Sequence, residues 1–343
     1  MNPDVQPASP HLDFGALLPG LGVFGGVRRF IEIGNELVRR GHRFVIYHPA
    51  GTPPEWLPFL GETRPTASLA GTRHQVLICN NPPQLGEFEE ARADLKLFYF
   101  ALEGIPGERS IASHAGWVIA VNSTGLHRRL QRRYGVDAEK AIGGIDLATF
   151  HPPESPRASG GPYRVLVFGR TSRKRKGTAL AIRAVESFAR SLGPGRVQLV
   201  LFDHVEPGNE RDSRAGAPGS EYHANLSQPA LAALYASGDV FVSAERRAGW
   251  SNTVAEAMAC GVPVVCTSSG TLDLAVHRES AWVARWRHPW FLSRGLRAMH
   301  DDPAMAARLR VAALARIGDF TWARVADQLE EIVRRRLASP PVV

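Results

Sequence analysis

Cysteine is scarce in this sequence: Cys79, Cys260 and Cys266 are the three among 343 residues. Three thiols cannot all pair within one chain, and each lies in or beside an apolar segment. We therefore expect buried free thiols in a reducing compartment. This excludes the class of small secreted proteins that disulfides hold together.

Long apolar runs and a secretory leader are missing as well. No run approaches the roughly 18 residues that a membrane-spanning helix needs. Residues 1–7, Met-Asn-Pro-Asp-Val-Gln-Pro, lack the basic start and the apolar core of a signal peptide. We therefore expect a cytoplasmic protein.

Residue patterns that hold metal ions are also missing. No group of cysteines and histidines has the spacing of a metal site. No Asp-x-Asp pair is present that could grip a divalent ion beside a diphosphate. We expect a protein that needs neither a metal nor a resident cofactor.

Positive charge exceeds negative charge, because 41 lysines and arginines stand against 33 aspartates and glutamates, a net charge of +8. Such a surface attracts nucleic acid, an anionic membrane face or phosphorylated substrates, and charge alone does not choose among them. With 44% hydrophobic residues, the chain has the composition of a soluble globular protein and the length of two domains.

Apolar strands alternate with amphipathic helices along both halves of the chain, which predicts α/β domains with mostly parallel, doubly wound sheets. Predicted strands cover 14–18, 43–47, 76–79, 95–100, 116–121, 164–168, 197–202, 240–243 and 262–266. Predicted helices cover 27–40, 126–134, 177–192, 228–237, 303–317 and 322–337.

A stretch rich in Pro, Ser and Gly, residues 152–162, separates the two halves. We predict an N-terminal Rossmann-like domain over 1–154 and a linker over 155–162. A second Rossmann-like domain follows over 163–320, and a C-terminal helix over 321–343 returns to the first domain. Two such domains create a cleft between the carboxyl ends of their strands, where open sheets bind ligands.

The segment 245–270 carries the clearest chemical signal. Ser251 and Asn252 are residue types that begin helices, a Gly and a Pro end this one, and an apolar strand follows. The amino end of such a helix suits a phosphate, because its N–H groups and its dipole are positive. Glu256, one turn further on, can accept two hydroxyl groups. The two neighbouring hydroxyl groups of a ribose would suit Glu256, and a phosphate beside a ribose indicates a nucleotide. An ordinary helix with a solvated acid fits the same residues.

Two cations flank a predicted strand-to-helix loop. Gly169 and Arg170 end a strand, and Lys176 and Gly177 open the next helix. Arg170 through its planar fork and Lys176 as a point charge would hold a diphosphate. The alternatives are a solvated charge run over 173–176 or a nucleic-acid patch. A nucleic-acid patch usually brings interleaved aromatic residues or a recognition helix, and neither is present here.

The first half contains the G-x-G-x-x-G pattern of nicotinamide-binding proteins over residues 20–25. That pattern requires an acidic residue at the end of the next strand, and residues 45–49, Val-Ile-Tyr-His-Pro, contain none. Gly25 and Gly26 still allow a backbone to approach a ligand closely. Glu103, in a loop after an aromatic strand, is the candidate carboxylate on this side of the cleft, and an ordinary loop acid is the equal alternative.

These segments together resemble the family-four glycosyltransferases, which use nucleotide sugars, retain the anomeric configuration and have the GT-B arrangement of two Rossmann-like domains. The resemblance covers most of the chain, and the order of the segments makes it specific. The matching segments are 25–26, 40–42, 144–146 with 150 and 152, 169–170, 176–177, 234–235, 239–243, 256–265 and 320–322.

The resemblance implies a role for each matched residue. Arg170 and Lys176 match the pair that neutralises the donor diphosphate, and Glu256 matches the glutamate that binds the nucleotide ribose. Gly25 and Gly26 match a first-domain loop at the reaction centre. A further loop matches the one whose backbone amides meet the donor phosphates. Its residues are Trp250, Ser251, Asn252 and Thr253.

Two positions depart from the family pattern. The first glutamate of its E-x7-E signature would stand where this chain has Ala248. That change is compatible with a deoxygenated or otherwise unusual sugar, or with reduced activity. The first-domain histidine near the sugar has no equivalent after residues 98–100, so Glu103 stays a candidate catalytic residue beside Arg170 and Lys176.

The resemblance implies transfer of a hexose or deoxyhexose from a nucleoside diphosphate sugar to a carbohydrate, lipid-linked or small-molecule acceptor, with retention and without metal. One alternative is a weakly active or inactive donor-binding relative that acts with a partner. Another is a nucleic-acid-binding protein that uses residues 173–176.

The basic surface and the apolar face of the helix over 322–337 also allow transient contact with the inner face of a membrane. We expect that helix instead to pack across both domains through its apolar residues, Val325, Leu329, Ile332 and Val333.

Overall fold

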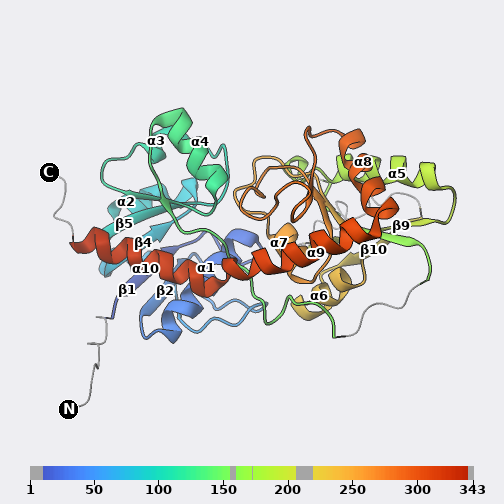
Figure 1. The fold of residues 1–343 in the computed structure, drawn as a ribbon. Helices are drawn as coiled ribbons and strands as arrows, with labels where there is room; N and C mark the ends of the chain where they lie inside the picture. Colours follow the sequence, from blue (N-terminus) through green and yellow to red (C-terminus); the bar gives the residue numbers. More distant parts are fainter. Residues whose placement is uncertain (1–10, 155–159, 172, 206–218, 339–343) are drawn as a thin grey trace, which may run out of the picture. The chain divides into compact units, whose positions relative to one another are not determined.

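The computed structural model describes residues 11–154, 160–171, 173–205 and 219–338 (Figure 1). Its internal contacts divide the chain into two compact units. Unit 1 holds the described residues of Met1–Tyr99, Pro106–Ala120 and Ala326–Val343. Unit 2 holds those of Phe100–Ile105 and Val121–Val325. Most of the predicted linker, residues 155–159, lies outside the described residues, so the predicted domain boundaries stay predictions.

The first sheet has seven strands among the described residues, in the order β3-β2-β1-β4-β5-β6-β7. The pairs β1–β2, β1–β4, β2–β3 and β4–β5 are all parallel. Its strands are β1 (Asp13–Leu17), β2 (Arg43–His48), β3 (Glu62–Pro65), β4 (Arg73–Cys79), β5 (Arg92–Phe100), β6 (Val118–Val121) and β7 (Glu139–Lys140). The helices between them are α1 (Gly25–Arg39), α2 (Leu85–Glu90), α3 (Glu108–Ala112) and α4 (Thr124–Tyr134).

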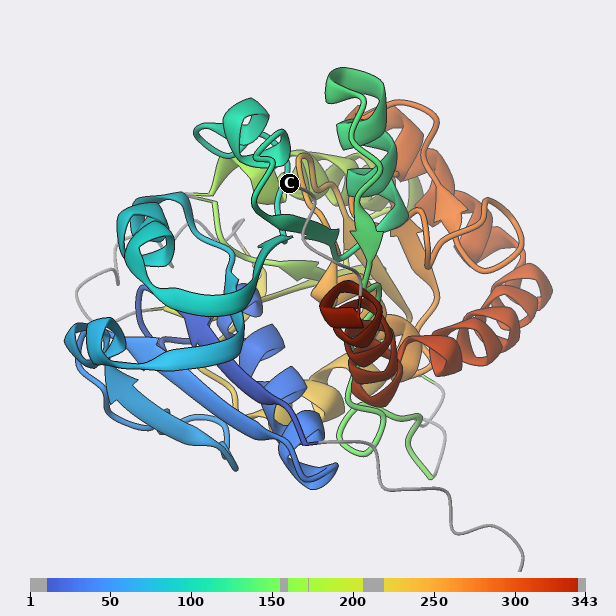
Figure 2. The same cartoon turned by 90° about the vertical axis from the view of Figure 1, so that its left-hand side faces the viewer.

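Helix α1 packs against β2 (Figure 2). Phe30, Ile33 and Leu37 are buried at helical spacing, which is the pattern that predicted the helix. Gly34 brings the backbone of α1 close to the strand, because a Cβ there would lie 2.7 Å from the ring of Phe44. The strand β2 ends at His48, so no carboxylate stands where the nicotinamide pattern needs one.

The second sheet has six strands among the described residues, in the order β10-β9-β8-β11-β12-β13, and all its pairs are parallel. Its strands are β8 (Tyr163–Phe168), β9 (Val197–Asp203), β10 (Glu221–Ala224), β11 (Val240–Ser243), β12 (Val264–Cys266) and β13 (Trp282–Val283). The longer helices that follow them are α5 (Thr178–Leu192), α6 (Gln228–Ala236), α7 (Asn252–Ala259), α8 (Pro289–Asp301), α9 (Pro303–Ile317) and α10 (Trp322–Ala338).

Both sheets place their first six strands in the order 3-2-1-4-5-6, which is the doubly wound Rossmann order. The predicted fold class, two Rossmann-like parallel-sheet domains, is confirmed. In the second sheet the order reverses between β8 and β11. Ligands of such sheets bind beyond the carboxyl ends of the two strands at this reversal.

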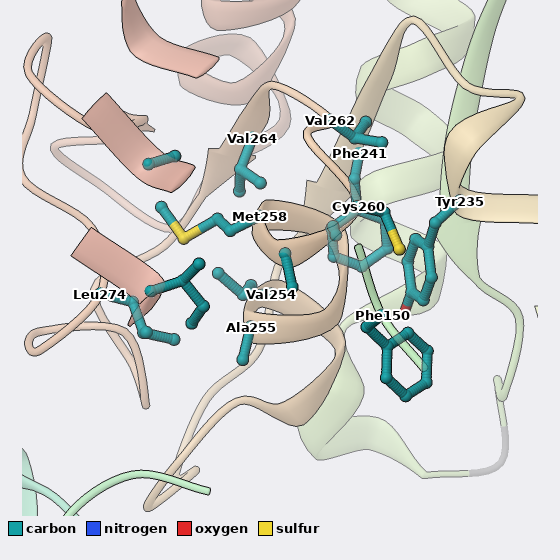
Figure 3. Close-up of a cluster of buried hydrophobic side chains, with 14 of the residues drawn as sticks. Phe150, Tyr235, Phe241, Val254, Ala255, Met258, Cys260, Val262, Val264 and Leu274 are labelled. Atoms are coloured by element: carbon teal, nitrogen blue, oxygen red, sulfur yellow. The ribbon is translucent and has the colours of Figure 1, made fainter. Parts of the chain in front are cut away.

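The second sheet is buried on both faces, which explains its continuous apolar strands. Val240 and Val242 face a cluster built mainly with α5 and α8, whereas Phe241 faces α6 and α7. Figure 3 shows this second cluster, in which Met258 and Val254 of α7 lie among neighbouring apolar side chains.

All three cysteines are free and buried, as predicted. Burial raises the pKa of the Cys79 thiol to about 11 and the pKa values of Cys260 and Cys266 to about 12. These thiols are therefore protonated and unreactive at neutral pH.

Helix α10 uses its apolar face inside the protein. Val325, Leu329, Ile332 and Val333 are each no more than 4% exposed. In unit 1, Arg40 Nη1 lies 2.8 Å from Asp327 Oδ1, and His42 contacts Glu330. Within the described part of the chain, no helix is both long and apolar enough to cross a membrane.

Candidate functional site

The carboxyl ends of β8 and β11 carry the residues that the sequence predicts to bind a diphosphate. Arg170 follows β8 directly, and Lys176 stands in the turn before α5. Glu245 follows β11, the strand paired with β8 at the reversal of strand order. These side chains therefore lie where an open α/β sheet binds its ligand.

Arg170 is held by a buried aspartate. Its Nε lies 3.0 Å from Oδ1 and 3.3 Å from Oδ2 of Asp203, the last residue of β9. The side chain of Asp203 is 1% exposed. Burial raises the pKa of this carboxyl, and the nearby Arg170 guanidinium acts in the opposite direction. Because this hydrogen bond uses Nε, the two terminal nitrogens of the guanidinium take no part in it. They can offer the pair of parallel N–H donors that suits a phosphate.

Lys176 is held in the same manner by Glu245, whose Oε1 forms a salt bridge with Nζ. The side chain of Glu245 is 4% exposed, and its Oε2 is buried without a hydrogen-bond partner among the described residues. Lys176 Nζ also lies 5.1 Å from the centre of the Phe168 ring, a cation–π distance. A residue so engaged does not belong to a solvated charge run, so that alternative is wrong for Lys176.

The two cations converge on one aromatic ring. Arg170 Cζ lies 6.0 Å from the centre of the Phe168 ring that Lys176 also approaches. The structure therefore brings the two predicted residues together, each with a buried carboxylate behind it. The roles of Asp203 and Glu245 are not predicted by the sequence patterns. The available signal was their position, since both follow the apolar run of a strand adjacent to β8.

The turn that carries Lys176 is fixed by its backbone. Lys174–Lys176 form a single 3₁₀ turn, and Gly177 follows with φ +72°. A Cβ on Gly177 would overlap the carbonyl oxygen of Ala244. The amide of Arg246 donates to the carbonyl of Arg175 at 2.8 Å. Close packing of this turn on the end of β11 is therefore what brings Lys176 to Glu245.

Helix α7 begins where the sequence predicts it, with Ser251 as the N-cap and Asn252 as its first residue. The Ser251 side chain makes no capping hydrogen bond to the helix. Its amide donates instead to the carbonyl of Gly270 at 2.9 Å, and its hydroxyl lies 3.5 Å from that of Thr253. Amide groups in the first turn of a helix have no acceptor within the helix, so those of Asn252 and Thr253 have the geometry that binds phosphate.

Glu256 lies on the buried face of α7 and is 4% exposed. The hydroxyl of Tyr235, on α6, donates to its Oε2 at 3.0 Å. The sequence left open a solvated first-turn acid, and burial excludes that alternative. A ribose at this position would share the carboxylate with Tyr235. Figure 3 shows the Tyr235 side chain beside the apolar cluster.

Trp250 precedes this helix and is 7% exposed. Its ring centre lies 5.3 Å from that of Phe320. The indole Nε1 is buried without a hydrogen-bond partner among the described residues. Because a buried indole N–H usually finds an acceptor, this donor is available to a ligand or a water molecule.

Ala248 is buried, and its surroundings are closed. It is 4% exposed, its amide donates to the Ser269 hydroxyl at 3.0 Å, and it forms an antiparallel bridge with Leu102. A Cβ on Gly270 would lie 2.7 Å from the Cβ of Ala248. The position where the family signature has a glutamate is therefore packed for a small side chain.

Glu103 and the glycine pair lie in different units. Glu103 is partly exposed, and residues 100–105 group with unit 2, together with Leu102 and its bridge partner Ala248. Gly25 and Gly26 are the first residues of α1 in unit 1. A Cβ on Gly26 would lie 3.5 Å from Asn80 Nδ2, which follows β4 at the reversal of the first sheet. The roles of these residues stay predictions.

Among the described residues, no group of three or more His, Cys, Asp or Glu side chains could hold a metal ion. The site consists of fixed cations, buried carboxylates and the amino end of α7.

This chain is similar to known glycosyltransferases. Residues 162–302, which contain Arg170, Lys176 and Glu256, match the family model described as glycosyl transferases group 1. This part of the chain belongs to that family. The resemblance of the sequence to family-four glycosyltransferases of GT-B type is thereby confirmed.

Curated glycosyltransferases and their relatives share modest identity with the chain. The D-inositol 3-phosphate glycosyltransferase of Pseudarthrobacter chlorophenolicus is 28% identical over 236 residues, which cover 64% of this chain and 56% of the relative. The O-antigen biosynthesis protein RfbC of Myxococcus xanthus is 29% identical over 211 residues, covering 61% of this chain and 16% of the relative. The chain thus spans little more than half the length of the first relative and much less of the second.

Solved glycosyltransferase structures share the fold over nearly the whole chain. Sucrose-phosphate synthase from Thermosynechococcus elongatus superposes with a TM-score of 0.75 at 17% identity, covering 95% of this chain and 99% of the other. HepE from Anabaena, in complex with UDP and glucose, superposes with a TM-score of 0.74 at 16% identity. The superposition covers 94% of this chain and 100% of HepE. The chain therefore has the GT-B fold.

Proposed function

We propose that the protein transfers a hexose or deoxyhexose from a nucleoside diphosphate sugar to an acceptor hydroxyl, with retention at the anomeric carbon and without metal. One observation carries the proposal: Arg170 and Lys176 converge on the Phe168 ring at the carboxyl ends of β8 and β11. Two fixed cations at this place suit a diphosphate. The complex of HepE with UDP and glucose and the names of the curated relatives support a nucleotide sugar as the donor.

The chemical requirement is stabilisation of charge. As the bond between the anomeric carbon and the phosphate oxygen breaks, negative charge grows on the diphosphate. Arg170, Lys176 and the first-turn amides of α7 are fixed before the reaction and stabilise that charge more than they stabilise the ground state. The acceptor hydroxyl would attack from the same face as the departing phosphate, which takes its proton. No protein base and no metal ion is needed for such a transfer.

The acceptor would be a carbohydrate, a lipid-linked molecule or a small molecule. RfbC is named for O-antigen biosynthesis, which favours a saccharide acceptor. The proposed location is the cytoplasm, with transient contact at the inner face of a membrane. Nucleic acid is not a proposed partner, because the run 173–176 has neither interleaved aromatic residues nor a recognition helix.

The experiment is an assay of the purified protein with a panel of nucleotide sugars and candidate acceptors, in which nucleoside diphosphate release and product are both measured. Arg170→Ala should lower turnover by about 100-fold or more, because it removes a group that stabilises the transition state. Arg308→Ala, an exposed arginine on α9, is the matched control and should leave the rate unchanged. Addition of EDTA should also leave it unchanged.

A second candidate is a donor-binding relative that needs a partner, which Ala248 favours because the family has a glutamate there. Nucleoside diphosphate binding without product formation, with every donor and acceptor tested, would support that candidate over the enzyme. Absence of both binding and product would contradict both.

A further inference from the structure

Two tryptophans of unit 2 lie on the surface rather than in the core. Trp286 is 61% exposed and Trp290 is 55% exposed. They flank the start of α8, where the side chain of His288 caps the helix by accepting from the amide of Trp290 at 3.2 Å. The core face of α8 is already occupied, because Leu292, Leu296 and Met299 are buried. The two indoles are therefore not needed to fill the interior.

The same segment is rich in arginine, with acidic residues only at its flanks: Glu279 precedes it, and Asp301, the last residue of α8, pairs with Arg297. Residues 280–300 contain four arginines, which are Arg285, Arg287, Arg294 and Arg297, and no aspartate or glutamate. Arg285 Cζ lies 5.8 Å from the centre of the Trp286 ring, and Arg294 Cζ lies 5.7 Å from that of Trp290. Each exposed indole is thus accompanied by an exposed guanidinium. We call Arg285, Trp286, Trp290 and Arg294 the Trp286–Trp290 surface.

We propose that the Trp286–Trp290 surface binds the interface of an anionic phospholipid bilayer. Indoles prefer the boundary between headgroups and acyl chains, because their apolar body and their polar N–H each find a suitable environment there. Arginines beside them meet the negative surface potential of anionic lipids. An acidic protein segment would suit the guanidinium groups, but it has no equivalent need for two exposed indoles.

The helix α10 is the other candidate for membrane contact. The sequence allows the apolar face of α10 to contact a membrane but favours its packing in the protein, and its residues Val325, Leu329, Ile332 and Val333 are buried. They could meet a bilayer only after the helix had left its place. The Trp286–Trp290 surface needs no such rearrangement, because its side chains are exposed in the folded chain.

The test is co-sedimentation of the full chain with vesicles of phosphatidylcholine alone and of phosphatidylcholine mixed with phosphatidylglycerol. We expect binding to the mixed vesicles, weakened by salt, and little binding to phosphatidylcholine alone. Trp286→Ala combined with Trp290→Ala should abolish it. Arg285→Gln combined with Arg294→Gln should weaken it by about fivefold per arginine. The assay needs no enzymatic activity, so its result is independent of the proposed sugar transfer.

The matched control is Val311→Ala, which changes an apolar side chain that is 68% exposed on α9. It should bind vesicles as the wild type does, and the melting temperatures of all variants should agree. Equal binding of the wild type and the tryptophan variant, or equal binding to neutral vesicles, would overturn the proposal. Heparin, a soluble polyanion, tests the other outcome. If the tryptophan variant lost heparin binding but kept vesicle binding, the surface would be assigned to a saccharide instead.

Discussion

The Nε atom of Arg170 donates to the buried carboxylate of Asp203, at 3.0 Å from Oδ1 and 3.3 Å from Oδ2. This bond holds the guanidinium through Nε, so the two terminal nitrogens take no part in it. We expect Asp203→Ala to lower turnover by about tenfold or more through loss of this orientation. In the Arg170→Ala background the same change should have almost no further effect, because the two residues act as one unit. Additive losses in this double-mutant cycle of rates would contradict the coupling.

Loss of Glu256 should weaken donor binding. Two charged hydrogen bonds to a ribose are worth about 1.5–3 kcal/mol each, so Glu256→Ala should raise the Kd of the donor by about 100-fold or more. Tyr235→Phe is the comparison, because it removes only the hydroxyl that donates to Glu256 at 3.0 Å. The phenylalanine ring should stay packed on Phe241. The substitution should therefore raise the Kd of the donor by about tenfold or less. Isothermal titration calorimetry measures both, and an unchanged Kd in Glu256→Ala would remove this residue from the site.

Gly177→Ala should destabilise the protein more than Gly135→Ala. Both glycines have φ +72°, so both substitutions carry a similar left-handed backbone cost of about 1–2 kcal/mol. A Cβ on Gly135 meets nothing within 4 Å, whereas one on Gly177 overlaps the Ala244 carbonyl. Urea unfolding should therefore separate the two variants, and only Gly177→Ala should also weaken nucleoside diphosphate binding. Equal losses of unfolding free energy would show that the turn can move away from β11.

Introducing the signature glutamate should not raise turnover. Ala248→Glu places a longer, charged side chain in a closed position and should reduce the free energy of unfolding by about 1–3 kcal/mol. Ala248→Gln has the same size without the charge, so the difference between the two variants isolates the cost of burying a carboxylate. Denaturant unfolding gives the stabilities. A rise in turnover for Ala248→Glu at unchanged stability would contradict the packing observed around this residue.

Stability should depend on Glu221 at acid pH. Arg164 donates to both oxygens of Glu221, at 2.7 and 3.1 Å, and these bonds, helped by His223, lower the pKa of Glu221 from 4.5 to about 2. A carboxyl whose pKa is lower in the folded state contributes stability above its unfolded pKa and loses it as the pH falls. The contribution should therefore disappear between about pH 4.5 and about pH 2. Since Glu221 is partly exposed, it should amount to only about 1 kcal/mol.

The matched variant for this prediction is Glu221→Gln. Its free energy of unfolding should be lower than that of the wild type near neutral pH, and the two should converge in acid. Parallel pH curves for the two proteins would mean that Glu221 has the same pKa in the folded and unfolded states.

Local patterns determined most of the fold. The helix predicted over 303–317 is α9 itself, and the prediction for 177–192 misses α5 by one residue, because amphipathic spacing depends only on near neighbours in the chain. The helix α8 (Pro289–Asp301) and the short strand β13 (Trp282–Val283) were missed. A two-residue edge strand has no period to detect, and exposed tryptophans obscure the apolar stripe that leads into α8.

The sequence by itself determined the α/β alternation, the position of the cations after their strand and the glycosyltransferase resemblance. Only the tertiary structure decided which partners these residues have. Asp203 lies 33 residues from Arg170, and Glu245 lies 69 residues from Lys176. Such pairs form because parallel pairing of β9, β8 and β11 brings three strand ends to one edge, and sheet order depends on long-range packing that no local pattern records.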